Sequence, residues 1–260
     1  MSRILTSQHG HVLLIELNRP EKKNAADMAL LHELSAAYGE LDRNPELRVG
    51  VVAAVGSDFT AGLDLADVAP HIKDGRLGMV APEGCDPWRM GNGPECRKPV
   101  VLAVNGLCLT LGIELAAASD VVVAAENTRF GQIEVARGIL PFGGATLRLP
   151  KRIGWGAAMQ WMLGAGMHDA AEAHRLGLVQ EVVPEAELRE RALAIAEQIA
   201  QQAPLAVQAT LTNARLAERE GEAAAIAGLP ALLEQLARTE DAQTAIAAFL
   251  SGQAPEFHGK

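Results

Sequence analysis

Residues 101–134 read VLAVNGLCLTLGIELAAASDVVVAAENTRFGQIE, and the rest of the chain is organised around this stretch. An apolar run ends at the turn signal Asn105-Gly106, a small-residue stretch of helical composition follows, and a second β-prone run comes next. Within this largely apolar sequence stand two carboxylates, Glu114 and Glu134. An ionisable side chain among apolar neighbours is costly to desolvate, so it usually has a task or a partner. We therefore expect a carboxylate pair that is able to do acid–base chemistry.

Three segments together resemble the crotonase family, also called the enoyl-CoA hydratase/isomerase family. They are FTAGLDL (59–65), AVNGLCLTLGIELAAASDVVVAAE (103–126) and TRFGQIEVARGILPFGGATLRL (128–149). The resemblance runs from about Leu13 to about Pro184. It implies an α/β fold, a spiral of ββα units with a helical C-terminal trimerisation region. We accordingly expect a crotonase-like α/β core with an acyl-CoA site in residues 1–200 and a helical C-terminal region in residues 201–260.

Composition narrows the classes of protein that this chain can belong to. Its 260 residues can bury a large core in one or two domains, and the hydrophobic content of 49% is that of a globular protein. A net charge of −9 disfavours nucleic-acid binding and adsorption to an anionic membrane. The N-terminus lacks a clear signal peptide, and no uncharged apolar stretch is long enough to span a membrane.

The cysteines give a prediction about compartment and metal content. Cys85, Cys96 and Cys108 are odd in number and have no metal-ligand spacing, so we read them as reduced thiols of a cytoplasmic protein. We expect no metal site, with a cluster of His71, Cys85 and Cys96 as a weak alternative.

Local signals predict the order of elements. Asp27 is a helix cap, Asn44-Pro45 a breaker, and Pro230 should kink or divide the last helix. Residues 66–98 hold five glycines and four prolines without sustained periodicity, and no structure is predicted for them. The expected strands are 11–17, 48–55 and 178–183; the expected helices are 27–42, 155–163 and 168–176, the last two ended by Gly164 and Gly177, and then 185–202, 204–220 and 222–250.

The resemblance also implies a substrate and the groups that bind it. The substrate is an acyl-CoA thioester, whose oxygen gains negative charge when a proton leaves the α-carbon or water adds to the double bond. Two preorganised backbone N–H groups can stabilise that charge. The resemblance assigns them to Ala61 and Leu111, the latter where the helix carrying Glu114 begins. The family usually has a run of glycines where this chain has Thr110-Leu111-Gly112.

By the same resemblance, Glu114 helps to activate water and Glu134 protonates the α-carbon. From the residues alone, Glu114 could equally satisfy a nearby backbone group, and Glu134 could be a surface residue at the end of a loop. The lysines near residue 22 could form an ordinary solvated turn. The substrate-binding residues that the resemblance implies are Ala61, Gly62, Leu63, Asp64, Leu111, Lys23 and Asn24.

The presence of both glutamates favours an enoyl-CoA hydratase, which adds water to a trans-2-enoyl-CoA to give a 3-hydroxyacyl-CoA. It would use no cofactor, because coenzyme A is part of the substrate. An enoyl-CoA isomerase, a CoA-thioester hydrolase or a decarboxylase are alternatives within the family. A non-catalytic acyl-CoA or RNA binder is the alternative of a different class. The resemblance further implies a homotrimer or a homohexamer formed as a dimer of trimers.

Overall fold

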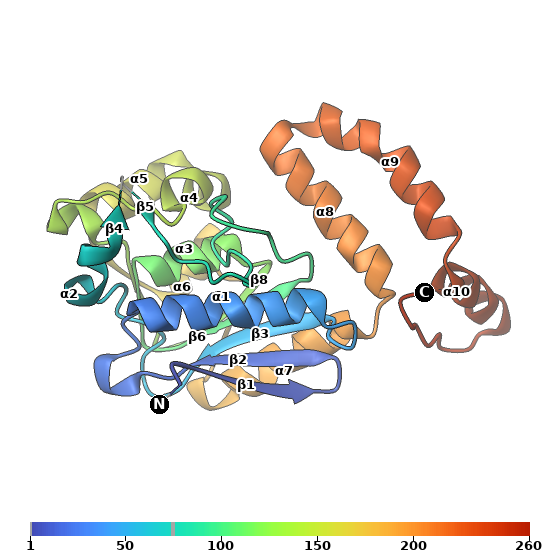
Figure 1. Cartoon of the computed structure of the whole chain (residues 1–260), viewed down its shortest axis with the longest axis horizontal. Coiled ribbons are helices and arrows are strands. Elements are labelled where there is room, and N and C mark those ends of the chain that lie inside the picture. Colours follow the sequence, from blue (N-terminus) through green and yellow to red (C-terminus); the bar gives the residue numbers. More distant parts are fainter. Residues whose placement is uncertain (1, 74–75) are drawn as a thin grey trace.

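The computed structural model describes residues 2–73 and 76–260, and its centre is a six-stranded sheet in the order β1-β2-β3-β6-β8-β11 (Figure 1). The hairpin β1–β2 is antiparallel, and the strands from β2 through β3, β6 and β8 to β11 run parallel to one another. The strands are β1 (Ile4–His9), β2 (Val12–Leu17), β3 (Val49–Ala54), β6 (Val100–Val104), β8 (Val121–Ala125) and β11 (Glu181–Val183).

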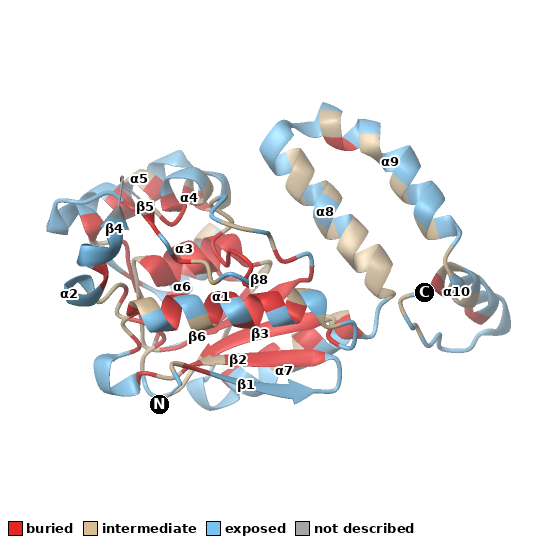
Figure 2. Ribbon diagram, in the orientation of Figure 1, coloured by how far each residue is buried: buried red, intermediate tan, exposed pale blue. Residues whose placement is uncertain are grey.

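Both faces of the sheet are covered, as expected for parallel strands that read as continuous apolar runs. Alternate residues of β3 show the division, since Val52 belongs to the core on one face while Val49 and Val51 belong to that on the other. Helix α1 (Met28–Arg43) packs on the first face, where Asp27 caps it by accepting from the Leu30 N–H. Helix α7 (Leu188–Ala200) packs on the second face, and Figure 2 shows the buried strands between the two helices.

The segment after β6 builds the part of the fold that matters for function. Strand β7 (Leu107–Leu109) leads into α3 (Leu111–Ala118), a helix whose residues are all buried. A second sheet in the order β10-β9-β7 places β9 (Arg129–Gly131) parallel to β7 and antiparallel to β10 (Met167–Asp169). The turn η3 (Glu134–Arg137) follows β9, so Glu134 and Glu114 each come shortly after one of the two paired strands β9 and β7.

The remaining elements of the α/β body are short helices, turns and strands that connect those named above. Short pieces between β3 and β6 are α2 (Leu65–Val68), η2 (Ala69–His71), β4 (Ile72–Lys73) and β5 (Arg76–Leu77), and η1 (Pro20–Lys22) precedes α1. Around the site and before α7 stand α4 (Ala145–Ile153), α5 (Trp155–Gly164), α6 (Ala170–Leu176) and η4 (Glu185–Glu187).

Three helices, α8 (Pro204–Glu220), α9 (Glu222–Ala237) and α10 (Glu240–Ser251), extend away from the α/β body (Figure 1). We call them the C-terminal arm. An ion pair between Arg215 of α8 and Asp120, 3.1 Å, ties the arm to the residue that precedes β8. The division of the chain at residue 200 stays a prediction.

Several sequence-based expectations need correction. Strand β1 was not predicted, and residues 107–109 form a strand where helical composition was read. Residues 167–169 are the strand β10 rather than the start of the helix that was predicted from residue 168. Strands β7 and β10 have only three residues each and β1 is largely polar, so pairing with neighbouring strands is what defines them.

The predicted ends of two helices were also wrong. Gly164 lies inside α5, and Ala165 takes the left-handed conformation that ends it, with φ 49°. Helix α9 continues through Pro230, and the chain divides only at Arg238–Thr239, where the Thr239 side chain caps α10. The starts of α1, α3 and α8 agree with the prediction, because each follows a local cap, turn or proline signal.

Candidate active site

A cavity of about 560 Å³ opens where the loop after β3, the start of α3 and the η3–α4 region meet. Its walls join segments far apart in the chain, and both predicted glutamates belong to them. The lining residues are Lys22, Ala25, Ala61, Leu63, Asp64, Leu65, Leu109, Thr110, Leu111, Glu114, Ile133, Glu134, Arg137, Ile139 and Phe142.

Glu114 lies one turn into α3 and is 2% exposed. Its Oε1 accepts the N–H groups of Gly143 (2.8 Å) and Ala145 (3.1 Å), which belong to the start of α4. Burial nevertheless raises the pKa of Glu114 to about 7, because desolvation outweighs these two bonds, and the charge of Glu134 raises it further. The side chain is thus held by the backbone yet titrates near neutral pH.

Glu134 stands at the start of η3 and is 5% exposed. Its Oε1 accepts a hydrogen bond of 2.7 Å from Nε2 of Gln132, which is itself fully buried. Within the described part of the chain its Oε2 has no partner, although that atom is buried. Burial raises the pKa of Glu134 to about 7 as well. A buried carboxyl oxygen without a donor favours the protonated acid, which can itself donate.

The two carboxyl groups act on each other electrostatically and therefore titrate as a pair. Burial raises the pKa of both groups, which favours the protonated form of each near neutral pH. The surroundings distinguish the members. The backbone N–H groups stabilise a negative charge on Glu114, while the unpaired oxygen of Glu134 can carry a proton. Two buried carboxyl groups with different hydrogen-bond surroundings thus line the same cavity.

The loop after β3 does not leave the Ala61 N–H available. This N–H donates to the Lys23 carbonyl at 2.9 Å, which corrects the assignment of Ala61 as an oxyanion donor. Two residues further on, Leu63 forms an isolated parallel bridge with Ala26. The Ala26 N–H donates to the Gly62 carbonyl, and the Ala26 carbonyl accepts from the Asp64 N–H. In such a bridge the N–H of the residue between the two bonded residues, here Leu63, points away from the partner segment.

The second candidate donor is where the sequence placed it. Leu111 is the first residue of α3, so its N–H has no acceptor in the preceding turn. Across residues 2–73 and 76–260, neither the Leu63 N–H nor the Leu111 N–H has a hydrogen-bond acceptor. Both residues line the cavity. The side chain of Leu111 is 4% exposed and packs into the core, and its carbonyl accepts from Nε1 of Trp88 at 3.1 Å.

The other predicted binding residues divide into lining and structural ones. Asp64 lines the cavity but pairs with Arg19 at 2.9 Å, which holds the pKa of that carboxyl below its usual range. Gly62 is buried with φ +93°, and a Cβ there would collide with the Thr110 hydroxyl. Both residues therefore shape the loop that presents the Leu63 N–H.

Neither Lys23 nor Asn24 lines the cavity. Asn24 is 1% exposed and makes three hydrogen bonds, accepting from the Arg19 N–H and donating to the carbonyls of Val55 and Asp58. The Lys23 side chain is largely exposed, with its Nζ 4.0 Å from Asp58. Lys22 lines the cavity instead.

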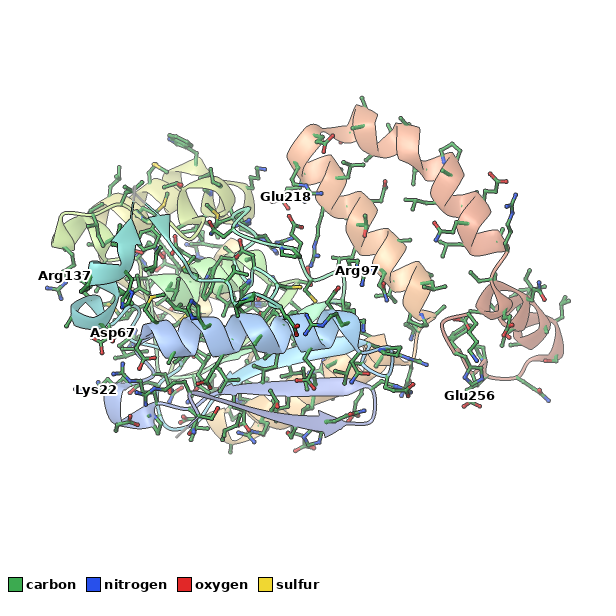
Figure 3. The ribbon with its side chains drawn as sticks, viewed as in Figure 1. Lys22, Asp67, Arg97, Arg137, Glu218 and Glu256 are labelled. Atoms are coloured by element: carbon green, nitrogen blue, oxygen red, sulfur yellow. The ribbon has the colours of Figure 1, made fainter. Side chains whose placement is uncertain are left out.

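Sequence reasoning missed two residues that line the cavity and two residues that donate hydrogen bonds to the glutamates. Lys22 and Arg137 lie at the same end of the molecule in Figure 3 and place two cations on the cavity wall. Gln132 and Gly143 hold the two glutamates. Gln132 could have been suspected as a polar side chain two residues before Glu134, whereas Gly143 could not, because only the fold brings it to Glu114.

Two further observations concern the described residues as a whole. In that part of the chain there is no group of three or more His, Cys, Asp or Glu side chains that could hold a metal ion. None of the helices there combines the length and hydropathy needed to cross a membrane.

The comparisons with known proteins agree on one family. A family model described as Enoyl-CoA hydratase/isomerase matches residues 7–260. The 2,3-dehydroadipyl-CoA hydratase of Escherichia coli K12 is 35% identical over 260 residues, which is 100% of each chain. The crystal structure of a probable enoyl-CoA hydratase/isomerase from Mycobacterium abscessus has a TM-score of 0.95 at 50% identity, covering 99% of each chain. That of an enoyl-CoA hydratase from Mycobacterium tuberculosis H37Rv has 0.89 at 33% identity and 100% coverage of both.

Proposed function

The chain belongs to the enoyl-CoA hydratase/isomerase family, with the crotonase fold expected from the sequence, and from this premise we propose that it is an enoyl-CoA hydratase. Its substrate would be a trans-2-enoyl-CoA and its product a 3-hydroxyacyl-CoA. The observation that carries this proposal is the pair of buried glutamates, Glu114 and Glu134, on one cavity, each with a pKa of about 7.

In the proposed complex the thioester oxygen accepts from the N–H groups of Leu63 and Leu111. Both donors are backbone groups that need no reorganisation, and the positive end of the α3 dipole adds to their effect. The enolate that forms when water attacks C3 places its charge on this oxygen. Losing one such donor costs about 10²–10³-fold in rate in other enzymes. This arrangement supports chemistry at C2 and C3 of a thioester.

The carboxyl pair then divides the elements of water between two carbons. Both carboxyl groups hold the water molecule, and Glu114 takes one of its protons as the remaining hydroxide bonds to C3. The C2–C3 double bond opens toward the thioester, and Glu134 delivers a proton to C2. Glu114 ends protonated and Glu134 ionised, so one proton transfer between them through solvent restores the starting state. Mass and charge balance without a cofactor.

The rest of the cavity suits the two ends of an acyl-CoA. Apolar side chains of Leu109, Ile133, Ile139 and Phe142 can surround the acyl chain, while Lys22 and Arg137 offer positive charge to a polyanionic CoA. We propose that the acyl group lies on the apolar side, beyond the glutamates.

Incubation with a panel of enoyl-CoAs, followed by mass spectrometry, tests the proposed reaction. The expected product has gained one water and keeps its thioester. Release of CoA would point to a hydrolase, loss of carbon dioxide to a decarboxylase, and a shifted double bond at unchanged mass to an isomerase. Any of these as the main product would overturn the hydratase proposal.

A further inference from the structure

A second cavity, of about 230 Å³, lies between α4, the loop before β6 and helix α8 of the C-terminal arm. It does not share a lining residue with the acyl-CoA cavity. Its walls carry five cations and two carboxylates: Arg89, Arg148, Lys151, Arg215, Arg219, Glu95 and Glu218. Figure 3 shows Glu218 on the side of α8 that faces the α/β body. We call this space the arm cavity.

Three of the five cations have carboxylate partners, and these pairs connect the body to the arm. Arg215 bonds Asp120 at 3.1 Å, and Arg219 bonds Glu95 at 2.7 Å. At the rim, Lys151 lies 3.9 Å from the Glu218 carboxylate and donates to its carbonyl at 3.1 Å. The pairs account for every carboxylate on the cavity wall and for Asp120 behind it.

The other two cations, Arg89 and Arg148, have no carboxylate within ion-pair distance among the residues that the structure describes. Arg148 donates to the Arg89 carbonyl at 2.9 Å, and its other contact is the Met90 sulfur at 3.7 Å. The Arg89 Nε is buried, and no acceptor reaches it. The charge of Asp86 also raises the pKa of Arg148, but its carboxylate oxygens accept hydrogen bonds from three backbone N–H groups and not from Arg148.

Desolvation lowers the pKa of both guanidinium groups, and the charges of Arg215 and Arg148 add to the effect at Arg89. The pKa of Arg89 falls to about 10. Both side chains are half-buried, and a partly desolvated charge without a direct carboxylate partner costs stability. The wall of the arm cavity carries five cations against two carboxylates, so it has an excess of positive charge that a bound anion would balance.

We propose that the arm cavity is a binding site for a free dianionic oxyanion of the phosphate type, held by Arg89 and Arg148. A guanidinium offers several N–H donors in a planar fork, which suits the oxygens of a phosphate. The cavity has room for it, since 230 Å³ corresponds to several water molecules at roughly 30 Å³ each. Lys151 and Arg219 at the rim add positive charge that attracts the anion.

Binding there has a structural consequence. The anion would join α4 and the 89–95 loop of the body to Arg215 and Arg219 of α8, so it would favour the docked position of the arm. The site would therefore make the stability of the protein depend on phosphate, by the ordinary linkage between a ligand and the state that binds it. This inference does not depend on the reaction performed in the acyl-CoA cavity.

The test is calorimetric titration of the whole protein with inorganic phosphate at about pH 8, at constant ionic strength, with chloride as the comparison anion. We expect saturable binding of phosphate and a rise in Tm that chloride does not reproduce. Arg89→Gln and Arg148→Gln should each weaken binding by at least about tenfold, since hydrogen bonds to a charged group are lost. Lys151→Gln at the rim should weaken it only a few-fold.

Arg238→Gln is the matched control, because Arg238 is an exposed arginine of the arm outside this cavity, and it should bind phosphate as the wild type does. Without phosphate, Arg89→Gln should melt no lower than the wild type, since it removes a half-buried charge that has no direct carboxylate partner. CoA and 3′-dephospho-CoA are also titrated into the phosphate-loaded protein. Displacement of phosphate by CoA alone would show that the 3′-phosphate of CoA competes for the site. Absence of saturable binding, or wild-type binding by both arginine variants, would overturn the proposal.

Discussion

Glu114 and Glu134 differ in what surrounds their oxygens, and that difference supports their separate roles. Two backbone N–H groups reach Glu114, whereas Glu134 has one side-chain donor and one unpaired buried oxygen. In the proposed mechanism the first suits a base that becomes neutral during water attack. The second suits an acid that becomes ionised as C2 is protonated.

At this scale the first prediction concerns the loss of either group. Glu114→Gln and Glu134→Gln should each lower the rate of hydration by ~10²-fold or more, the range expected for a lost general acid or base. Enoyl-CoA binding should survive in both, because the proposed N–H donors remain. Steady-state kinetics with a separate binding measurement checks this. Near-wild-type turnover in either variant would exclude the proposed pair.

The second prediction follows from the raised pKa of Glu114. The pKa of this carboxyl is about 7 in the folded state, against an ordinary value of 4.5. Between pH 4.5 and pH 7 the folded protein therefore binds more protons at this group than the unfolded chain does. The free energy of unfolding therefore falls as pH rises through this window. Glu114→Gln removes that contribution, and at pH 8 the variant should be more stable than the wild type, by up to about 3 kcal/mol.

Urea unfolding at pH 5 and at pH 8 provides the measurement. The gain in the free energy of unfolding should shrink toward pH 5, where Glu114 is protonated in the folded protein. An equal effect of the substitution at both pH values would contradict the raised pKa of this buried side chain.

The third prediction tests the backbone donors. Leu111→Met keeps both the N–H and most of the buried volume, so it should retain most activity. Leu111→Pro removes the N–H at the first helical position, which proline tolerates, and should lower kcat/KM by about 10²–10³-fold. Circular dichroism must show that α3 still forms. Equal activity of two folded variants would refute a role for this N–H.

The residue that sequence reasoning misplaced lies in the same small region. Ala61 and Leu63 are alternate residues of one extended loop, and either could present its N–H to the cavity. The Lys23 carbonyl accepts from the Ala61 N–H, and the bridge to Ala26 leaves the Leu63 N–H pointing the other way. Lys23 and Ala26 are distant from the loop in sequence, so these contacts exist only in the folded chain. The placement of Glu114 relative to Leu111 needs only local geometry, because one turn of α3 separates them.

At the scale of elements, the site depends on contact between α3 and the start of α4. Gly143 lies against the Glu114 carboxylate, and a Cβ at that glycine would overlap the carboxylate oxygen. The elements themselves were largely predictable where the signal is local. Asp27 caps α1, Asn44 ends it, and Pro204 begins α8. Strands β1 and β10 were missed because their sequences are polar and only pairing defines them.

The fourth prediction belongs to this contact. Gly143→Ala should displace the Glu114 carboxylate and lower kcat by ~10²-fold, since a misplacement of about 1 Å can cost that much. Gly156→Ala in α5 is the control, because a Cβ there meets nothing within 4 Å, and its activity should be unchanged. A fully active Gly143→Ala variant would show that the position of this carboxylate is not critical.

At the scale of the whole molecule, the C-terminal arm exposes a large apolar surface. Phe249 is 87% exposed and Leu250 79%, and Ile226, Leu233 and Ile246 are each more than 60% exposed. Several large exposed apolar side chains on one segment suggest an interaction site, and closed cyclic symmetry would bury them without an open end. We propose that the arm carries the interface of a homotrimer, or of a hexamer made from two trimers.

The fifth prediction is the mass of that assembly. Light scattering coupled to size-exclusion chromatography should give three or six times the chain mass of 27.4 kDa. Phe249→Asp, which places a charge on the apolar face, should shift the protein toward monomer. A fully active monomer of the wild type at micromolar concentration would contradict the proposed assembly.

The central claim is that this cavity adds water across C2 and C3 of an enoyl thioester, and isotope labelling tests it most directly. In separate reactions in ¹⁸O-labelled water and in deuterium oxide, the account predicts one heavy oxygen at C3 and one deuterium at C2 of a product with an intact thioester. Glu114→Gln and Glu134→Gln should form that product at least ~10²-fold more slowly. Heavy oxygen found only in a released carboxylic acid, or deuterium incorporation without oxygen, would contradict it.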